Sequence, residues 1–230
     1  MGLSKVFINL FIVLLCCQVF AQTPNNKQII NDTKDAIVLI SVKHRENGEF
    51  FPAGTGWLYK DGNHIATAAH VVSETKDHKL VVSYAVKVTF TDGEEESAET
   101  ILSKFTDVAV LTIKAKKERN PLVLANKNPE LCDFLIGSGY ALGKSTITVF
   151  VGIVSGESEN FGYDGFPYLV DAMQTNAIIC PGHSGSAALN NKGEVIGLIV
   201  ANSYQCPSRN YFIPKDIVEK ELKLLLSDET

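Results

Sequence analysis

Short apolar segments separated by turn-forming residues run through most of this chain, and they restrict it to a β-rich fold. Turn signals such as Asp61-Gly62-Asn63 and Thr91-Asp92-Gly93 lie between segments rich in valine, isoleucine, phenylalanine and tyrosine. The segments cover residues 36–42, 54–59, 80–84, 87–90, 107–113, 121–125, 147–155, 168–173, 194–200 and 210–214. So many short strands at close spacing predict an all-β fold, either a sandwich or a pair of barrels.

Helical periodicity is convincing only at the end of the chain. Residues 215–227 place apolar side chains on one broad face, and Pro214 suits the first turn of a helix because it needs no N–H donor there. A second, short helix is predicted over residues 68–73. The charged region 114–130 divides the strands into two groups, and we interpret it as the connection between a first barrel over about 36–115 and a second over about 131–214.

The first 21 residues have the pattern of a secretory signal peptide. One positive charge at Lys5 precedes an almost unbroken apolar run over residues 6–17, and Val19 and Ala21 suit the −3 and −1 positions of a signal-peptidase site. The run is shorter than the roughly 20 residues that span a bilayer, although an uncleaved anchor is the alternative. We therefore expect a signal peptide over 1–21 and a secreted or periplasmic domain over 22–230 with no membrane anchor after cleavage.

Composition excludes several classes of partner and cofactor. The chain has 21 basic and 26 acidic residues, a net charge of −5, and no long run of Lys or Arg, so a nucleic-acid partner is not expected. The five histidines, at positions 44, 64, 70, 78 and 183, are scattered and match no metal-binding spacing. Beyond the leader, Cys132, Cys180 and Cys206 allow one disulfide and one spare thiol in an oxidising compartment. No metal or other cofactor is predicted, and the sequence does not define an oligomeric state.

Three segments together carry a candidate catalytic chemistry. His70 follows a strand-like segment, Asp107 opens an apolar strand, and Ser184 lies in the small-residue loop Gly182-His183-Ser184-Gly185. Each alone also fits a structural role. Together they supply a nucleophile, a base and a carboxylate that can orient the base. Glycines beside a serine also let backbone N–H groups converge where an oxyanion develops.

On these residues the chain resembles the trypsin-like (chymotrypsin-fold) serine proteases over about residues 39–214. The motifs that carry the resemblance are GTGW at 54–57, TAAHVV at 67–72, TDVAVL at 106–111, GHSGS at 182–186 and GEVIG at 193–197. Within the family, YALG at 140–143, VGIVS at 151–155 and FIP at 212–214 are most similar to the bacterial HtrA/Deg branch. The Ser-Gly-Ser sequence is closer to the glutamyl endopeptidase branch.

The resemblance implies two perpendicular six-stranded β-barrels with a C-terminal α-helix and an active site in the cleft between the barrels. His70 would be the general base and then the general acid, Asp107 would orient it, and Ser184 would be the acyl-forming nucleophile. The backbone N–H groups of Gly182 and Ser184 would form the oxyanion hole. The implied function is a serine endopeptidase acting on proteins or peptides.

Several departures from the family pattern leave an alternative open. His183 occupies the position before the nucleophile where activatable trypsin-like zymogens carry an aspartate, so activation by capture of a new N-terminus is not expected. Ser186 and Ala187 replace the more frequent Gly-Pro, and no PDZ-sized segment follows the last helix. The alternative is a catalytically silent homologue that acts as a protein-binding module. A Cys180 nucleophile is a third, weaker alternative, because no family pattern places it there.

The resemblance also implies a disulfide. Cys180 stands four residues before Ser184, and Cys206 falls on the matching far wall of the specificity pocket. We therefore predict a Cys180–Cys206 bridge with Cys132 free.

The specificity pocket is predicted from the same resemblance. Its floor falls at Ile178, and Ile199 occupies the place of the histidine that glutamyl endopeptidases use. The walls would come from Val200, Ala201, Asn202 and Asn210. Since burying an unpaired cation is costly, these residues predict cleavage after a small or medium uncharged residue, with the substrate paired as a β-strand along residues 200–202.

Overall fold

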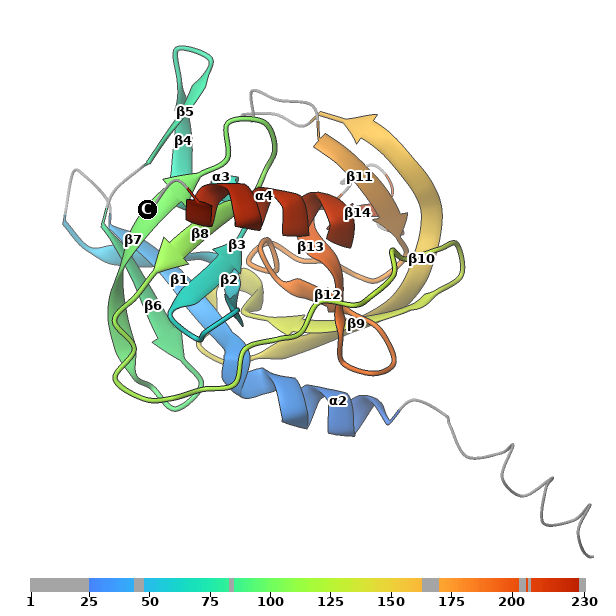
Figure 1. Ribbon diagram of the computed structural model, residues 1–230, viewed down its shortest axis with the longest axis horizontal. Helices are drawn as coiled ribbons and strands as arrows, with labels where there is room; N and C mark the ends of the chain where they lie inside the picture. The colour runs from blue at the N-terminus through green and yellow to red at the C-terminus, as the bar shows by residue number, and fades with distance from the viewer. Residues whose placement is uncertain are drawn as a thin grey trace, which may run out of the picture.

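Two closed six-stranded antiparallel barrels make up most of the computed structural model (Figure 1). The structure describes residues 25–43, 48–82, 85–162, 170–202, 206 and 208–227. The last strand of the first barrel ends at Thr112 and the first strand of the second begins at Phe134, and residues 114–130 lie between them. The predicted all-β, chymotrypsin-like architecture with a C-terminal helix is confirmed. The predicted leader over 1–21 lies outside the described residues.

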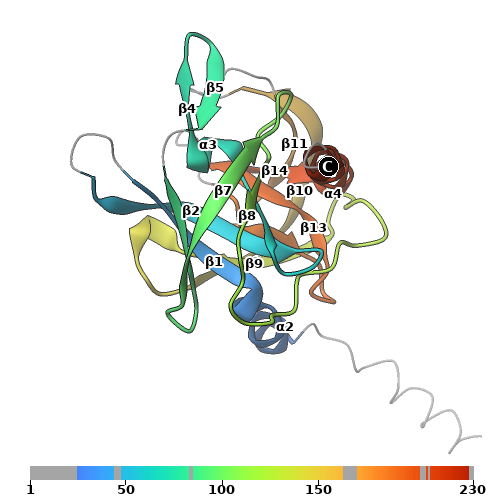
Figure 2. The ribbon, with the colours of Figure 1, turned by 60° about the vertical axis from the view of Figure 1, so that its left-hand side comes forward.

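The first barrel closes in the strand order β1-β2-β3-β8-β7-β6. A two-stranded hairpin, β4-β5, stands out from this barrel in both ribbon views (Figures 1 and 2). The barrel strands are β1 (Ile37–Lys43), β2 (Phe50–Tyr59), β3 (His64–Thr67), β6 (Val86–Phe90), β7 (Glu95–Leu102) and β8 (Ala109–Thr112), and the hairpin strands are β4 (Ser73–Lys76) and β5 (Lys79–Val82). Ile40, Leu58 and Ile65 are completely buried, because alternate residues of each strand point into the barrel.

The second barrel closes in the order β10-β11-β14-β13-β12-β9. Its own core includes Leu135, Phe150 and Phe212. The strands are β9 (Phe134–Gly139), β10 (Thr148–Phe161), β11 (Val170–Thr175), β12 (Ala187–Leu189), β13 (Val195–Asn202) and β14 (Asn210–Pro214), and a single 3-10 turn, η2 (Ala141–Gly143), follows β9.

The predicted C-terminal helix is present as α4 (Lys215–Ser227), and it touches both barrels. It contacts β8 of the first barrel and β13 and β14 of the second, and Figure 2 shows it nearly along its axis. Val218, Leu222 and Leu225 are its buried apolar residues. Among the described residues, no helix has the length and apolar character needed to cross a membrane.

A second helix, α2 (Asn26–Thr33), was missed by the sequence analysis. Its composition is polar, and only Ile29 and Thr33 are buried. The Asn25 side chain caps its start by accepting the Gln28 N–H at 3.1 Å, and a 3-10 turn, η1 (Lys34–Ala36), joins it to β1. With only two buried residues, the helix shows no strong apolar periodicity in the sequence.

The predicted strand over residues 121–125 is wrong. This segment forms only isolated bridges, from Leu122 to Tyr59 in the first barrel and from Leu124 to Val195 in the second. Its apolar residues therefore link the two barrels instead of extending a sheet. In contrast, β7 is mostly polar because much of it lies at the surface, and its sequence (EESAETIL) carried no strand signal.

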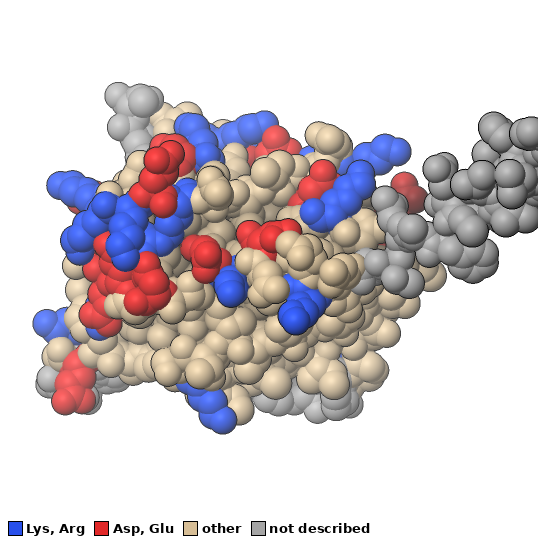
Figure 3. Space-filling model, turned by 90° about the horizontal axis from the view of Figure 1, so that it is seen from below, with Lys and Arg blue, Asp and Glu red and all other residues tan. Residues whose placement is uncertain are grey.

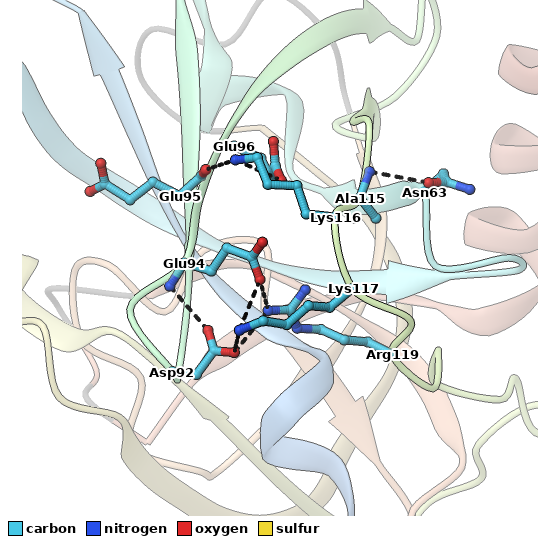
Figure 4. Close-up of polar contacts among 9 residues, drawn as sticks. All are labelled: Asn63, Asp92, Glu94, Glu95, Glu96, Ala115, Lys116, Lys117 and Arg119. Carbon is cyan, nitrogen blue, oxygen red and sulfur yellow. Dashed lines mark hydrogen bonds and ion pairs between the residues drawn. The ribbon is translucent and has the colours of Figure 1, made fainter.

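Ion pairs join the segment between the barrels, residues 114–130, to the first barrel. The Arg119 guanidinium lies 2.6 Å from a Glu94 carboxylate oxygen and 3.0 Å from Asp92, and Lys117 pairs with Asp92 at 2.9 Å (Figure 4). Arg119 also stacks over the Phe90 ring at 3.7 Å. On the face of the molecule seen in Figure 3, acidic and basic side chains are intermixed, and no field of a single sign covers it.

Candidate active site

His70 and Asp107 come together because the strands that carry them are paired. His70 lies in the short helix α3 (Ala69–Val72) directly after β3, and Asp107 precedes β8, which pairs with β3 in the register Thr67 to Ala109. One Asp107 oxygen lies 2.6 Å from His70 Nδ1, and the other accepts the His70 backbone N–H at 2.9 Å. The Asp107 side chain is completely buried, and its two oxygens contact the ring and the backbone N–H of His70.

The Asp107 carboxylate also sets the basicity of the His70 ring. Burial by itself lowers the pKa of His70, but the charge of Asp107 and its hydrogen bond outweigh burial and raise that pKa above 6.5. Because Asp107 accepts at Nδ1, the neutral ring carries its proton there. The Nε2 atom is then the nitrogen that can take up a proton.

The loop that presents Asp107 is anchored by the C-terminal helix. Ser103 Oγ accepts the N–H groups of Phe105 and Thr106, both at 3.1 Å. It donates its own proton to Glu221 of α4 at 2.7 Å. Ser103 and Glu221 are both buried. The sequence carries no signal for this pair, because 118 residues separate its members and neither belongs to a motif.

A tight turn over Cys180–His183 precedes Ser184. The His183 N–H donates to the Cys180 carbonyl at 3.0 Å, Pro181 takes the second position, and Gly182 has φ +96° at the third, the signature of a type II turn. The Pro181 carbonyl accepts the Leu142 N–H at 2.7 Å. The Pro181 carbonyl and the Gly182 N–H belong to the same trans peptide, in which C=O and N–H point in opposite directions. The Gly182 N–H is therefore aimed away from Leu142.

Ser184 is held between the two barrels. Its carbonyl accepts the Thr55 N–H of β2 at 2.9 Å, and its Oγ lies 3.4 Å from the Val200 carbonyl of β13. Gly185 packs so closely that a Cβ there would lie 2.1 Å from the Thr55 carbonyl and 3.1 Å from the Ala68 nitrogen. The loop that carries Ser184 (residues 182–185, the serine loop) therefore packs directly against the residues that precede His70.

A surface cavity of about 440 Å³ adjoins the type II turn. It is lined by Pro52, Ala53, Gly54, Tyr140, Leu142, Gly143, Pro181 and Gly182. The lining carries no ionisable group other than the Tyr140 hydroxyl, whose pKa burial raises to about 12. The cavity is therefore an uncharged space on the Gly182 side of the serine loop.

The structure corrects the predicted pocket floor. The Ile178 side chain is 71% exposed, whereas its neighbours Ala177 and Ile179 are buried. Successive residues of an extended segment point to opposite sides, and this alternation leaves the Ile178 side chain facing solvent. A count of residues back from Ser184 located the segment but not the direction of the side chain.

The other predicted pocket residues lie on β13 and β14. Ile199 is completely buried in the core of the second barrel, and Val200 is also buried. Asn210 is buried, and its side-chain amide donates to the Ala177 carbonyl at 2.7 Å. Ala201 and Asn202 pair through their backbones with Tyr211 and Asn210.

The predicted Cys180–Cys206 disulfide is also corrected. Cys132, Cys180 and Cys206 are all free thiols among the described residues. Cys206 is exposed between β13 and β14, where its sulfur lies 3.5 Å from Ser208 Oγ, while Cys180 is half-buried in the turn. The turn is held by hydrogen bonds instead. Across the described ranges, no group of three or more His, Cys, Asp or Glu residues could hold a metal ion.

A family model described as a trypsin-like peptidase domain matches residues 54–198, more than half of the chain. The match runs from β2, two strands before His70, into β13, two strands after Ser184. The chain belongs to the trypsin-like peptidase family. The resemblance read from the sequence motifs is thereby confirmed.

Curated relatives support the HtrA/Deg resemblance. The chain is 30% identical over 181 residues to a probable periplasmic serine endoprotease DegP-like from Chlamydia trachomatis, covering 76% of this chain and 34% of the relative. It is 33% identical over 174 residues to the putative serine protease HhoB from Synechocystis, covering 74% and 38%. The chain thus spans little more than a third of the length of these two relatives.

Solved structures show the same fold. The active form of the Rv3671c protease from M. tuberculosis superimposes with a TM-score of 0.72 at 21% identity, covering 87% of this chain and 85% of that one. The serine endoprotease from Yersinia pestis gives 0.70 at 23% identity, covering 89% and 68%. The two-barrel architecture is therefore the one shared with these proteins.

Proposed function

We propose that this chain is a serine endopeptidase that uses Ser184, His70 and Asp107 as its catalytic triad. The observation that carries the proposal is the buried Asp107 carboxylate, which binds both the ring and the backbone of His70. That arrangement orients the ring and stabilises it when it becomes charged, as a general base requires. Membership of the trypsin-like peptidase family and the DegP-like and HhoB relatives support the same chemistry.

In the proposed reaction, the Ser184 hydroxyl oxygen bonds to the carbonyl carbon of the scissile peptide while its proton passes to His70 Nε2. The carbonyl oxygen becomes an oxyanion and is bound by the backbone N–H groups of Gly182 and Ser184. The intermediate collapses, the C–N bond breaks, and the leaving amine takes the proton from His70. A water molecule then attacks the acyl carbon and gives a proton to His70. The C–O bond to Ser184 breaks, Ser184 Oγ takes that proton back, and the carboxylic acid product leaves.

We expect the substrate to bind as an added strand along residues 200–202. In the described sheet, β12 pairs with β13 only as far as Leu198, and β14 lies on the other side of β13. The wall residues Val200 and Asn210 bring no charge to this edge. A substrate Lys or Arg would therefore find no counter-ion there, and we propose cleavage after small or medium uncharged residues.

Labelling with a fluorophosphonate probe tests the proposal. The wild-type protein should be labelled once, at Ser184, and Ser184→Ala should abolish both the label and peptide cleavage. Ser97→Ala, which changes an exposed serine on β7, is the matched control and should behave as the wild type. A correctly folded wild-type protein that does not label would instead favour the catalytically silent binding module.

Sequencing the cuts in a peptide library tests the specificity. Val, Ala, Thr or Leu before the scissile bond is expected. Dominant cleavage after Lys, Arg or Glu would contradict the argument from the uncharged wall residues Val200 and Asn210.

We also propose that the protein is exported after cleavage behind Ala21. The charged start and short apolar run of the first 21 residues support this, as does the periplasmic description of the Chlamydia relative. Measuring the intact mass of the protein purified separately from the membrane fraction and the soluble fraction of its native cells tests this cleavage. A soluble, exported species that begins at Gln22 is expected, and a full-length protein retained in the membrane would refute cleavage.

A further inference from the structure

His183 is a buried side chain that the proposed triad does not use. It lies directly before Ser184 and is only 3% exposed. Its ring packs against Phe150 of β10 with a centroid distance of 5.0 Å, and a Cβ on Gly139 of β9 would approach its Cδ2 at 3.2 Å. A polar ring enclosed in this way needs hydrogen-bond partners at both nitrogens.

Both ring nitrogens have such partners, and the partners determine where the proton is. Nδ1 accepts the Cys180 backbone N–H at 3.1 Å, so it carries no proton. Nε2 lies 2.7 Å from Thr148 Oγ1, and the Thr148 hydroxyl donates its proton to the Gly139 carbonyl at 3.1 Å. Nε2 must therefore be the donor in its contact with Thr148. The four groups form one directed chain, from the Cys180 N–H through His183 and Thr148 to the Gly139 carbonyl.

This chain holds the first residue of the type II turn. His183 binds Cys180 twice, since its ring accepts the Cys180 N–H and its own backbone N–H donates to the Cys180 carbonyl at 3.0 Å. Thr148 connects the ring to the start of β10 and the end of β9. The orientation of the Pro181–Gly182 peptide, and with it the Gly182 N–H, depends on this turn.

We propose that His183 and Thr148 are positioning residues that keep the Gly182 N–H directed into the oxyanion hole, with the His183 ring neutral and protonated at Nε2. The inference rests on the proposed function for its catalytic consequence. The turn is then held without a charged group. A second proton, at Nδ1, would face the Cys180 N–H and break the chain.

The surroundings of His183 agree with a neutral ring. The groups that face it are Gly139 from β9, Thr148 and Phe150 from β10, and Cys180 from its own loop, and of these only the Cys180 thiol is titratable. Burial lowers the pKa of His183 to about 4. The ring therefore stays uncharged at neutral pH.

A matched pair of variants tests the role of the chain of hydrogen bonds. Thr148→Val removes the hydroxyl at nearly constant volume, and Thr148→Ser keeps it. Removal of one oxyanion donor lowers kcat by about 10²–10³-fold in other serine proteases, so a turn that is only loosened should lose about 10-fold or more in kcat for Thr148→Val with little change in KM. Thr148→Ser should recover most of that loss. Equal kcat values in the two variants, or a loss confined to KM, would overturn the inference.

Two further measurements separate this inference from the proposed function. The ring 15N shifts of His183 in the Ser184→Ala protein should show the Nε2–H tautomer at pH 7, and the amide resonance of Gly182 should move in Thr148→Val but not in Thr148→Ser. These readouts need no activity. An Nδ1–H tautomer, or an unmoved Gly182 resonance, overturns the positioning role even if Ser184 labels normally. If Ser184 does not label while both shifts are as expected, the proposed function fails and the arrangement of the turn stands.

Discussion

Replacement of Ser103 by alanine should weaken both the fold and the catalytic site, although Ser103 touches neither His70 nor Asp107 in the described contacts. Ser103→Ala leaves the buried Glu221 carboxylate without its 2.7 Å donor, a loss of about 1.5–3 kcal/mol for a hydrogen bond to a charged group. The buried Thr106 loses the acceptor of its N–H, about 1 kcal/mol more. We therefore expect Ser103→Ala to lower the free energy of unfolding by roughly 2.5–4 kcal/mol.

Urea denaturation in the Ser184→Ala background, which avoids self-cleavage, measures this change. Glu221→Gln keeps an oxygen acceptor for Ser103 and should cost about 1 kcal/mol or less. The exposed Ser97→Ala change is again the control. With Ser184 intact, Ser103→Ala should also lower kcat/KM, because the loop that presents Asp107 loses its anchor on α4. A Ser103→Ala protein within about 0.5 kcal/mol of the control would refute the argument.

Three other outcomes are expected. Because Asp107 raises the pKa of His70 above 6.5 and Nε2 must be unprotonated to accept the Ser184 proton, kcat/KM should rise with pH through an apparent pKa above 6.5; a flat profile would contradict the base role. The pKa of His183 is about 4 in the folded protein and about 6.5 in the unfolded chain. Between these two pH values the imidazole is therefore protonated in the unfolded state and neutral in the folded state. Stability from the neutral ring is complete above pH 6.5 and falls toward pH 4, by up to about 3 kcal/mol, and urea denaturation of His183→Phe should lack this fall. Gly185→Ala should destabilise by about 3 kcal/mol or more, because φ is +86° and the new Cβ would meet the Thr55 carbonyl at 2.1 Å; a change in melting temperature equal to that of Ser97→Ala would refute this.

The sequence alone determined the fold class, the two groups of strands and the C-terminal helix. These features follow from local patterns: alternation along each strand, turn residues between strands, and helical periodicity over 215–227. It also located the candidate triad residues, since each lies in a short motif, and the structure brings His70 and Asp107 into contact.

Only the tertiary structure decided the contacts that hold those residues in place. Thr55 donates its hydroxyl proton to the Gly182 carbonyl across 127 residues of sequence, and Ser103 reaches Glu221 across 118. Such pairs have no local signature, because each forms only when two barrels and a helix close on one another. The same limit explains the errors at Ile178 and Cys206: a residue count gives the segment, but the path of the backbone decides which way a side chain points and what it meets.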